Sequence, residues 1–196
     1  MWALRRHGFT IVELLIVIVV IGILAGLAVA GFSGVQKRAL DTTRLSDMQT
    51  ITKALRMYKE TYGTFPTHNA SANAWGWEVS TTGTGPTNFI GALSQQRVIS
   101  KVPVDPLNKG LASGTSMSEY LTPDVENATV YEYFYYKGTA GSGGCDVAWG
   151  DWYVLGITQM ATVQYGQKSP QNPATPPCGY TSLGQVAWYT MGFANR

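Results

Sequence analysis

The sequence predicts an α+β fold, in which one long N-terminal helix packs against a small antiparallel β-sheet. Two observations lead to this prediction. Residues 14–36 are predominantly apolar and carry no charge, and apolar side chains then recur at helical spacing as far as Tyr62. Aromatic, strand-like segments bounded by turn residues follow from residue 130 onward. A helix followed by strands, instead of alternating with them, is typical of the α+β class.

The charge of the chain is small and unevenly distributed. The 196 residues carry a formal net charge of +2, which does not indicate a nucleic-acid surface. Residues 1–8 and 9–62 each contribute +2, whereas residues 63–196 contribute −2 and are rich in Gly, Thr, Ser, Tyr and Trp. We therefore predict one head of ordinary domain size after an N-terminal extension, and no nucleic-acid partner.

The uncharged segment 14–36 predicts a transmembrane helix. Its 23 residues measure about 35 Å as a helix, and a hydrocarbon core is about 30 Å thick. Arg5 and Arg6 precede it and predict a cytoplasmic N-terminus. A secretory signal cut after Ala30 and a plain membrane anchor are the alternatives. Neither explains Glu13, because an acid in an apolar segment opposes insertion.

The residues around Glu13 form a more specific pattern. Two arginines and Gly8 precede the run "FTIVELL", which starts at Phe9, and an apolar helix with Gly and Ala residues follows. This arrangement resembles the N-terminal signature of type IV pilins and type II secretion pseudopilins. The resemblance implies the pilin fold, cleavage between Gly8 and Phe9 by a prepilin peptidase, and methylation of the new Phe9 amine.

The same resemblance implies a location and partners. The precursor is expected in the cytoplasmic membrane with one transmembrane pass, and the processed chain in an extracellular filament. Other copies of the chain, a membrane platform and an assembly ATPase are the expected partners. Glu13 is implied to meet the N-terminal amine of a neighbouring subunit. Such a pair, at about 4 Å and an effective dielectric of about 20, attracts by roughly 4 kcal/mol before desolvation is subtracted.

Glycines in the apolar helix predict close packing between helices. Gly22 and Gly26 are four residues apart, a spacing that lets two helices approach closely in a membrane. The core of a filament would use the same property. We therefore expect Gly22 and Gly26 to serve helix packing.

The helix is predicted to continue as an amphipathic half over residues 37–62. Its apolar stripe has steps of three and four residues and comprises Leu45, Met48, Ile51, Leu55, Tyr58 and Tyr62. Polar residues, Arg44 and Asp47 among them, are predicted on the other faces, and Gly63 and Pro66 are predicted to end the helix. The predicted parts are a leader (1–8), a transmembrane or filament-core helix (9–36), an amphipathic helix (37–62) and a head (63–196).

The head is predicted to contain a short helix at 88–99 and strand candidates at 130–137, 152–160 and 185–191. The turn-rich stretch 138–144 separates the first two strands, as in an antiparallel pair. Trp75 and Trp77 are expected to hold down the long loop 64–86. The sequence Val102-Pro-Val-Asp-Pro106 predicts a turn.

The two cysteines, Cys145 and Cys178, both lie in the head and enclose a proline-rich loop. A disulfide is predicted if the head lies outside the cytoplasm, and two separate buried thiols are the alternative. Some pseudopilins that resemble this chain bind calcium through clustered aspartates in a C-terminal loop. Asp146 and Asp151 are the only nearby candidates here, and the cluster of aspartates is missing. Neither a metal site nor a cofactor is therefore predicted.

These features predict a structural protein and no enzyme, since the sequence lacks G-x-S-x-G, H-E-x-x-H, P-loop and C-x-x-C motifs. The predicted function is that of a subunit of a type IV pilus or a pilus-like filament. The first alternative is a type II secretion pseudopilin. The second is a membrane-anchored carbohydrate-binding or adhesive module, in which Trp149, Trp152 and Trp188 form a binding platform. Core and subunit-contact positions are the preferred prediction for these tryptophans.

Overall fold

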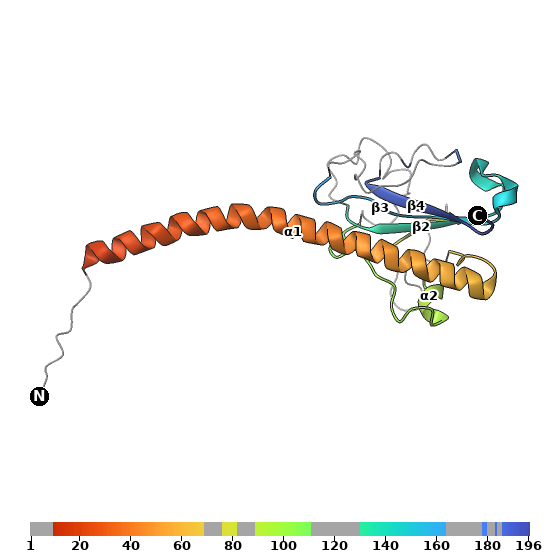
Figure 1. The fold of residues 1–196 in the computed structure, drawn as a ribbon, viewed down its shortest axis with the longest axis horizontal. Coiled ribbons are helices and arrows are strands. Elements are labelled where there is room, and N and C mark those ends of the chain that lie inside the picture. Colours follow the sequence, from red (N-terminus) through yellow and green to blue (C-terminus); the bar gives the residue numbers. More distant parts are fainter. Residues whose placement is uncertain are drawn as a thin grey trace, which may run out of the picture. The chain divides into compact units, whose positions relative to one another are not determined.

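A computed structural model describes residues 10–68, 76–81, 89–110, 130–163, 178–179, 183 and 186–196. The chain divides into two units, with the boundary between Ala39 and Leu40. Helix α1 (Ile11–Tyr62) is followed in the head by the strands β1 (Glu78–Val79), β2 (Tyr133–Gly138), β3 (Trp152–Ile157) and β4 (Trp188–Phe193) (Figure 1). Short helical turns complete the described elements: α2 (Ala92–Gln95), η3 (Ser142–Gly144) and η4 (Val147–Trp149). A long helix with a small antiparallel sheet is the predicted α+β pilin fold.

The end of helix α1 follows from its last residues. Lys59 places a positive charge in the last turn, where the helix dipole favours it. Gly63 adopts the left-handed conformation, with φ +76°, and its N–H donates to the Lys59 carbonyl over 2.8 Å. Glycine adopts this conformation without the steric cost of a side chain, so it ends helices efficiently. The predicted end of the helix at Tyr62 is therefore confirmed.

The sheet has the order β1-β2-β3-β4, and each neighbouring pair is antiparallel. Tyr133 pairs with Ile157 at one end of the central hairpin, and Gly138 pairs with Trp152 at the other. Three predicted strands are confirmed with shifted ends. Strand β1 was not predicted, because two residues leave no periodic pattern; it lies within the segment predicted as a long loop.

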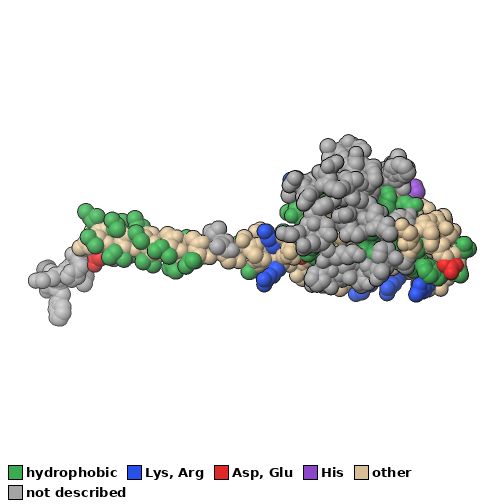
Figure 2. Space-filling model, turned by 90° about the horizontal axis from the view of Figure 1, so that it is seen from above, with side chains coloured by type: hydrophobic (Ala, Val, Ile, Leu, Met, Phe, Trp, Pro, Cys, Tyr) green, Lys and Arg blue, Asp and Glu red, His purple; other side chains and the backbone are tan. Residues whose placement is uncertain are grey.

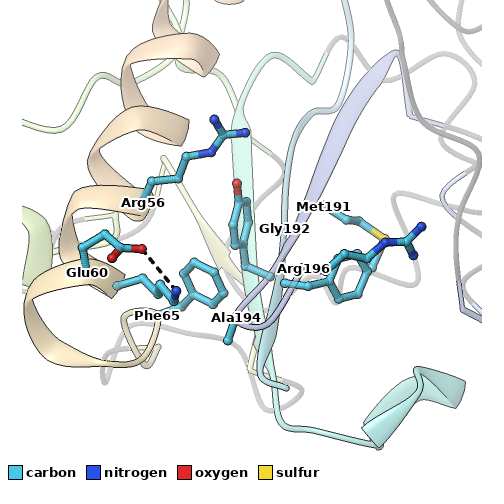
Figure 3. A pocket seen from close by; sticks show the side chains of 10 residues that line it. Arg56, Glu60, Phe65, Met191, Gly192, Ala194 and Arg196 are labelled. Carbon is cyan, nitrogen blue, oxygen red and sulfur yellow. Dashed lines mark hydrogen bonds and ion pairs between the residues drawn. The ribbon is translucent and has the colours of Figure 1, made fainter. Parts of the chain in front are cut away.

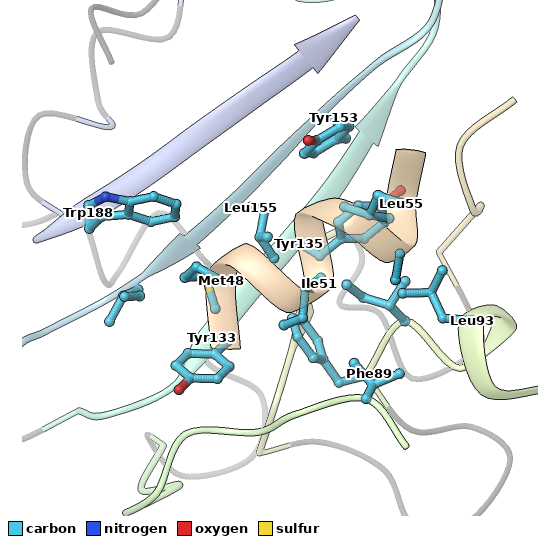
Figure 4. Packing of buried hydrophobic residues seen from close by; sticks show 14 of the residues in the cluster. Met48, Ile51, Leu55, Phe89, Leu93, Tyr133, Tyr135, Tyr153, Leu155 and Trp188 are labelled. Atoms are coloured by element: carbon cyan, nitrogen blue, oxygen red, sulfur yellow. The ribbon is translucent and has the colours of Figure 1, made fainter. Parts of the chain in front are cut away.

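Residues alternate between the two faces of the sheet and form two apolar clusters. Along β3, Tyr153 and Leu155 join the cluster that packs against α1, whereas Trp152 and Val154 join the cluster on the other face. Figure 4 shows Met48, Ile51 and Leu55 of α1 packed on the first face. The predicted apolar stripe is buried at these three positions, and its last residue, Tyr62, is 43% exposed.

The predicted helix at 88–99 is wrong in length, because α2 is a single turn of four residues. Ile90 and Arg97 have φ values of +45° and +56°, which interrupt a helix on both sides of α2. The Ile90 N–H instead donates to the buried Glu78 carboxylate over 2.7 Å. Phe89, Ile90 and Leu93 are all buried in the core. Tertiary packing therefore determines this segment more than helical propensity does.

Candidate functional site

The start of α1 holds the predicted assembly residue in a capping box. The backbone N–H and the hydroxyl of Thr10 both donate to Glu13 Oε2, each over 2.8 Å. The Glu13 N–H donates in return to Thr10 Oγ1 over 3.2 Å. This reciprocal bonding fixes the carboxylate at the end of the helix where N–H groups lack intrahelical partners.

Sequence reasoning missed Thr10, although the pattern Thr-x-x-Glu is a known signal for a capping box. Gly8 and Phe9, the predicted cleavage and methylation sites, lie outside the described residues. Their roles stay predictions. The structure shows that Thr10 binds the Glu13 carboxylate in the single chain and orients it.

The N-terminal part of α1 exposes an apolar surface. Fifteen large hydrophobic residues are at least 48% exposed: Ile11, Val12, Leu14, Leu15, Ile16, Val17, Ile18, Val19, Val20, Ile21, Ile23, Leu24, Leu27, Phe32 and Val35. Figure 2 shows apolar side chains along this stretch of the helix. By length and composition, α1 is the one described helix that could cross a membrane. Water disfavours so large an apolar surface, which indicates a lipid or protein environment.

No contact among the described residues explains why this segment contains glycines. A Cβ atom placed on Gly22 or Gly26 would meet nothing within 4 Å among the described residues. Neither residue therefore allows a close contact inside the chain. Small residues on an exposed apolar helix suit close approach to a second helix. The packing role of Gly22 and Gly26 stays a prediction.

A buried ionic network lies where α1 enters the head. The Arg44 side chain is fully buried, and its Nε donates to Asp105 Oδ2 over 2.7 Å. Its Nη1 donates to Asp41 Oδ1 over 2.8 Å. The guanidinium carbon also lies 4.8 Å from the centroid of the Tyr131 ring. The prediction that Arg44 lies on a polar face is wrong, because Asp105, 61 residues away in sequence, draws the cation into the head.

Electrostatics favour the ionised form of this network. Burial opposes the charge of Arg44, but hydrogen bonds and Coulomb attraction from Asp105 and Asp41 outweigh burial and raise its pKa. Burial likewise opposes ionisation of Asp41, yet the hydroxyl of Thr162 and the N–H groups of Ala161 and Thr162 lower its pKa. Beside it, burial raises the pKa of Asp47, whose carboxylate accepts from the Tyr133 hydroxyl over 2.8 Å.

We expect Asp41 to make the stability of the head depend on pH. Its lowered pKa means that ionisation is more favourable in the folded chain, so this stabilisation is present above about pH 4 and is lost as pH falls through the folded pKa. Asp41→Asn should therefore lose less stability than the parent chain between pH 7 and pH 3. Urea unfolding midpoints at both pH values measure this. Asp146→Asn, at an exposed residue, is the control and should follow the parent.

The two cysteines form the predicted disulfide, Cys145–Cys178, with a sequence separation of 33 residues. Cys145 is buried, and the neighbouring Gly179 N–H donates to the Gly143 carbonyl over 3.1 Å. The alternative of two separate buried thiols is thereby excluded. The bridge joins the turn after β2 to the segment that precedes β4.

We expect Cys145→Ser with Cys178→Ser to lower the free energy of unfolding by roughly 3–4 kcal/mol, since the bridge closes a loop of about 34 residues. Urea unfolding of the detergent-solubilised chain, followed by tryptophan fluorescence, measures the loss. Reductant should destabilise the parent chain by a similar amount and leave the double variant unchanged. Equal stability of the parent with and without reductant would contradict the prediction.

The predicted tryptophan platform does not form as one surface. Trp152 and Trp188 are both buried, and they belong to the clusters on opposite faces of the sheet. Trp149 is half-buried and meets the Phe193 ring edge-on, with centroids 5.0 Å apart. The preferred prediction, core positions, holds for the first two. Trp75 lies outside the described residues, and Trp77 packs against Phe134 and Tyr136.

The two aspartates considered for calcium have other partners. Asp146 Oδ1 accepts from the Ala148 N–H at the start of η4. The Lys137 ammonium lies 2.9 Å from Asp151 and is the main reason that the pKa of this carboxyl is lowered. Among the described parts of the chain, no group of three His, Cys, Asp or Glu side chains is placed to hold a metal ion.

Comparisons with known proteins agree with the residue pattern at the N-terminus. Residues 4–29 match the family described as the prokaryotic N-terminal methylation motif. The chain is 37% identical over 70 residues to type II secretion system core protein G of Aeromonas hydrophila. The matched residues cover 36% of this chain and 49% of that protein. It is 25% identical over 150 residues to core protein G of Vibrio cholerae, covering 76% of this chain and 94% of that protein.

A pilin is also similar. The type IV major pilin protein PilA of Myxococcus xanthus is 35% identical over 83 residues, covering 39% of this chain and 38% of the pilin. The chain spans about half the length of the first curated relatives it matches. No solved structure matches. The predicted resemblance to type IV pilins and type II secretion pseudopilins is confirmed.

Proposed function

We propose that this chain is a pilin-like subunit, which is stored in the cytoplasmic membrane and polymerises into an extracellular filament through the N-terminal part of α1. The observation that carries the proposal is the exposed apolar surface from Ile11 to Val35, on a helix that starts with the oriented carboxylate of Glu13. A lipid bilayer would cover this surface in the precursor, and the helices of other copies would cover it in a filament.

Processing gives the carboxylate its partner. A prepilin peptidase would cut between Gly8 and Phe9 and methylate the new amine, leaving a cation at Phe9. In a filament, Glu13 of one copy would pair with the Phe9 amine of the next. An unpaired buried carboxylate is unfavourable, so this pairing would select one register of docking. A membrane platform and an assembly ATPase would extract the helix from the membrane.

A type II secretion pseudopilin is the second candidate. It is favoured by the match that extends over 94% of core protein G of Vibrio cholerae. In that case the filament would be short and would act in secretion. Long filaments made mostly of this chain would instead support a major pilin.

The N-terminal peptide mass of the chain from sheared extracellular material tests the proposal. A peptide that begins at Phe9 and carries one added methyl group is the expected result. A start at Gly31 would indicate a cleaved secretory signal. If only chains that begin at Met1 occur, and only in membranes, the anchored carbohydrate-binding or adhesive module replaces the filament subunit.

A further inference from the structure

A groove runs between α1 and β4 within the unit Leu40–Arg196. One pocket, of about 380 Å³, lies between Arg56 of the helix and Gly192 of the strand. A second pocket, of about 260 Å³, shares Arg56 with the first and extends to Lys53 and Thr190. We call the two pockets together the α1–β4 groove. Figure 3 shows Arg56 on the helix side of the first pocket and Gly192 on the strand side.

Small side chains on β4 make this groove deep. Thr190, Gly192 and Ala194 alternate along the chain and line the groove on the sheet face toward α1. A Cβ atom on Gly192 would lie 2.2 Å from the Tyr153 ring, so only glycine leaves space for this ring at the floor of the groove.

The groove also reaches the outer edge of the sheet. β4 is the last strand in the order of the sheet, and from Thr190 to Phe193 its partners among the described strands all lie in β3. Met191 and Phe193, whose side chains belong to the cluster on the opposite face, also line the first pocket, so the pocket extends to the backbone of β4. Alternate residues of an edge strand direct their N–H and C=O groups away from the sheet, where an added strand can bind them.

The α1–β4 groove has an excess of positive charge. Four cationic side chains and one carboxylate line it, Lys53, Arg56, Lys59, Arg196 and Glu60, which gives the side chains a net charge of +3. Lys59 Nζ lies 3.2 Å from Glu60 Oε1, so these two charges balance each other. Lys53 and Arg56 are exposed, and neither has a carboxylate within ion-pair distance among the described residues. The groove therefore favours an anionic ligand.

An acidic peptide in extended form matches the edge, the depth and the charge of the groove together. Its backbone would pair with β4, and every second side chain would point to the α1 side. Carboxylates on that side would meet Lys53 and Arg56, and a guanidinium binds a carboxylate through two parallel hydrogen bonds. A polysaccharide or a nucleic acid would use the cations but would leave the strand edge without a partner.

The described part of the head offers no acidic strand that could bind the groove of another copy. Seven of its carboxylates are buried or bonded to groups of the same chain: Asp41, Asp47, Glu60, Glu78, Asp105, Glu132 and Asp151. Asp146 is exposed, but it is a single acid next to the short turn η4. We therefore assign the acidic segment to a different protein.

We propose that the α1–β4 groove binds an acidic segment of a partner protein, which adds a strand to the edge of β4. Backbone hydrogen bonds along β4 supply affinity, and Lys53 and Arg56 select for carboxylates. The site belongs to the head alone, so this inference goes beyond the proposed filament function and does not depend on it.

Titration of the full chain in detergent with a fluorescent synthetic peptide tests the proposal. The probe is about eight residues long and alternates Glu with Val, so that all its carboxylates lie on one face of a strand. Saturable binding is expected. The same peptide with Lys in place of Glu should bind more weakly by about tenfold or more, because like charges then face each other. Equal binding of the two peptides would overturn the proposal.

Charge reversal in the groove provides the matched variants. Lys53→Glu with Arg56→Glu should weaken binding of the acidic probe by about tenfold or more and should strengthen binding of the Lys probe, which also shows that the variant is folded. Arg97→Glu with Lys101→Glu makes the same change in net charge at exposed cations that line neither pocket, and should leave both affinities unchanged. An equal loss in this control would show attraction to net charge only and would contradict the proposal.

N-methylation of the probe separates strand addition from a general attraction to anions. Methyl groups on one alternate set of peptide N–H groups face β4 and should reduce binding by about tenfold, whereas methyl groups on the other set face away and should have little effect. An oligonucleotide or a polyuronate of equal charge should compete weakly with the probe. If either competes as well as the peptide, or if both methylated peptides bind equally, the groove is a general site for polyanions and the proposal is wrong.

A photo-crosslinking residue at Thr190 in the full-length chain identifies the occupant in the native host. The expected product joins the chain to a different protein through an acidic segment, and the acidic probe and the groove variant should both abolish it. A product that joins two copies of the chain would make a second copy the occupant and would overturn the proposal. If the chain is not cut at Phe9 and forms no filaments while the probe still binds, only the proposed function fails.

Discussion

Glu13→Ala strongly weakens filament assembly and leaves processing intact: this is the largest effect we expect. The variant loses the carboxylate that would pair with the Phe9 amine of a neighbouring copy and leaves that amine unpaired in an apolar environment. We expect about a hundredfold fewer filaments, which corresponds to about 3 kcal/mol per subunit contact. The amount of sheared filament measures assembly, and the mass of the peptide that begins at Phe9 measures processing.

The capping box provides matched controls for this result. Glu13→Gln keeps an acceptor for the Thr10 hydroxyl but removes the charge. If the ion pair matters, Glu13→Gln is as defective as Glu13→Ala. Thr10→Ala keeps the charge and removes the cap, which costs about 0.5–2 kcal/mol of helix stability, and should reduce the yield much less. Normal filaments from Glu13→Gln would show that Glu13 acts only as a helix cap.

The long helix could be predicted because its signals are local. The uncharged segment, the apolar stripe through Met48 and Leu55 and the stop at Gly63 all depend on spacing along one element. The strands were recognised for the same reason, since aromatic and β-branched residues cluster in β2 and β3. The disulfide required only the two cysteines and an assumption about the compartment.

The remaining features depend on contacts that spacing does not reveal. Arg44 precedes Met48 by four residues and therefore lies on the same face of α1 as Met48 and Leu55, but its charge predicted a polar position, and only the distant Asp105 supplies the counter-ion that allows its burial. Ile90 lies in a helix-like pattern, but its N–H donates to the Glu78 carboxylate and its side chain is buried in the core. Arg56 and Arg196 likewise line one pocket, although they are 140 residues apart in sequence. Such features become visible only in the folded chain.

Arg44→Met is expected to have the largest effect on the stability of the head. The methionine fills a similar volume but leaves the carboxylates of Asp41 and Asp105 without their cation. The side chain of Asp105 is fully buried, so water does not reach its carboxylate. Removal of one partner from a buried ion pair costs about 3–5 kcal/mol. Urea unfolding of the detergent-solubilised chain at pH 7 measures this loss.

Arg56→Met is the matched control, because Arg56 lies on the same helix and is exposed. We expect it to change the free energy of unfolding by less than about 0.5 kcal/mol. Asp105→Asn in the Arg44→Met background should recover part of the loss. The amide oxygen of asparagine can still accept from the N–H groups of Leu107 and Asn108, as Asp105 Oδ1 does, without a buried charge. If Arg44→Met and Arg56→Met are equally mild, the network contributes little to stability, and packing of Met48, Ile51 and Leu55 alone holds α1 on the sheet.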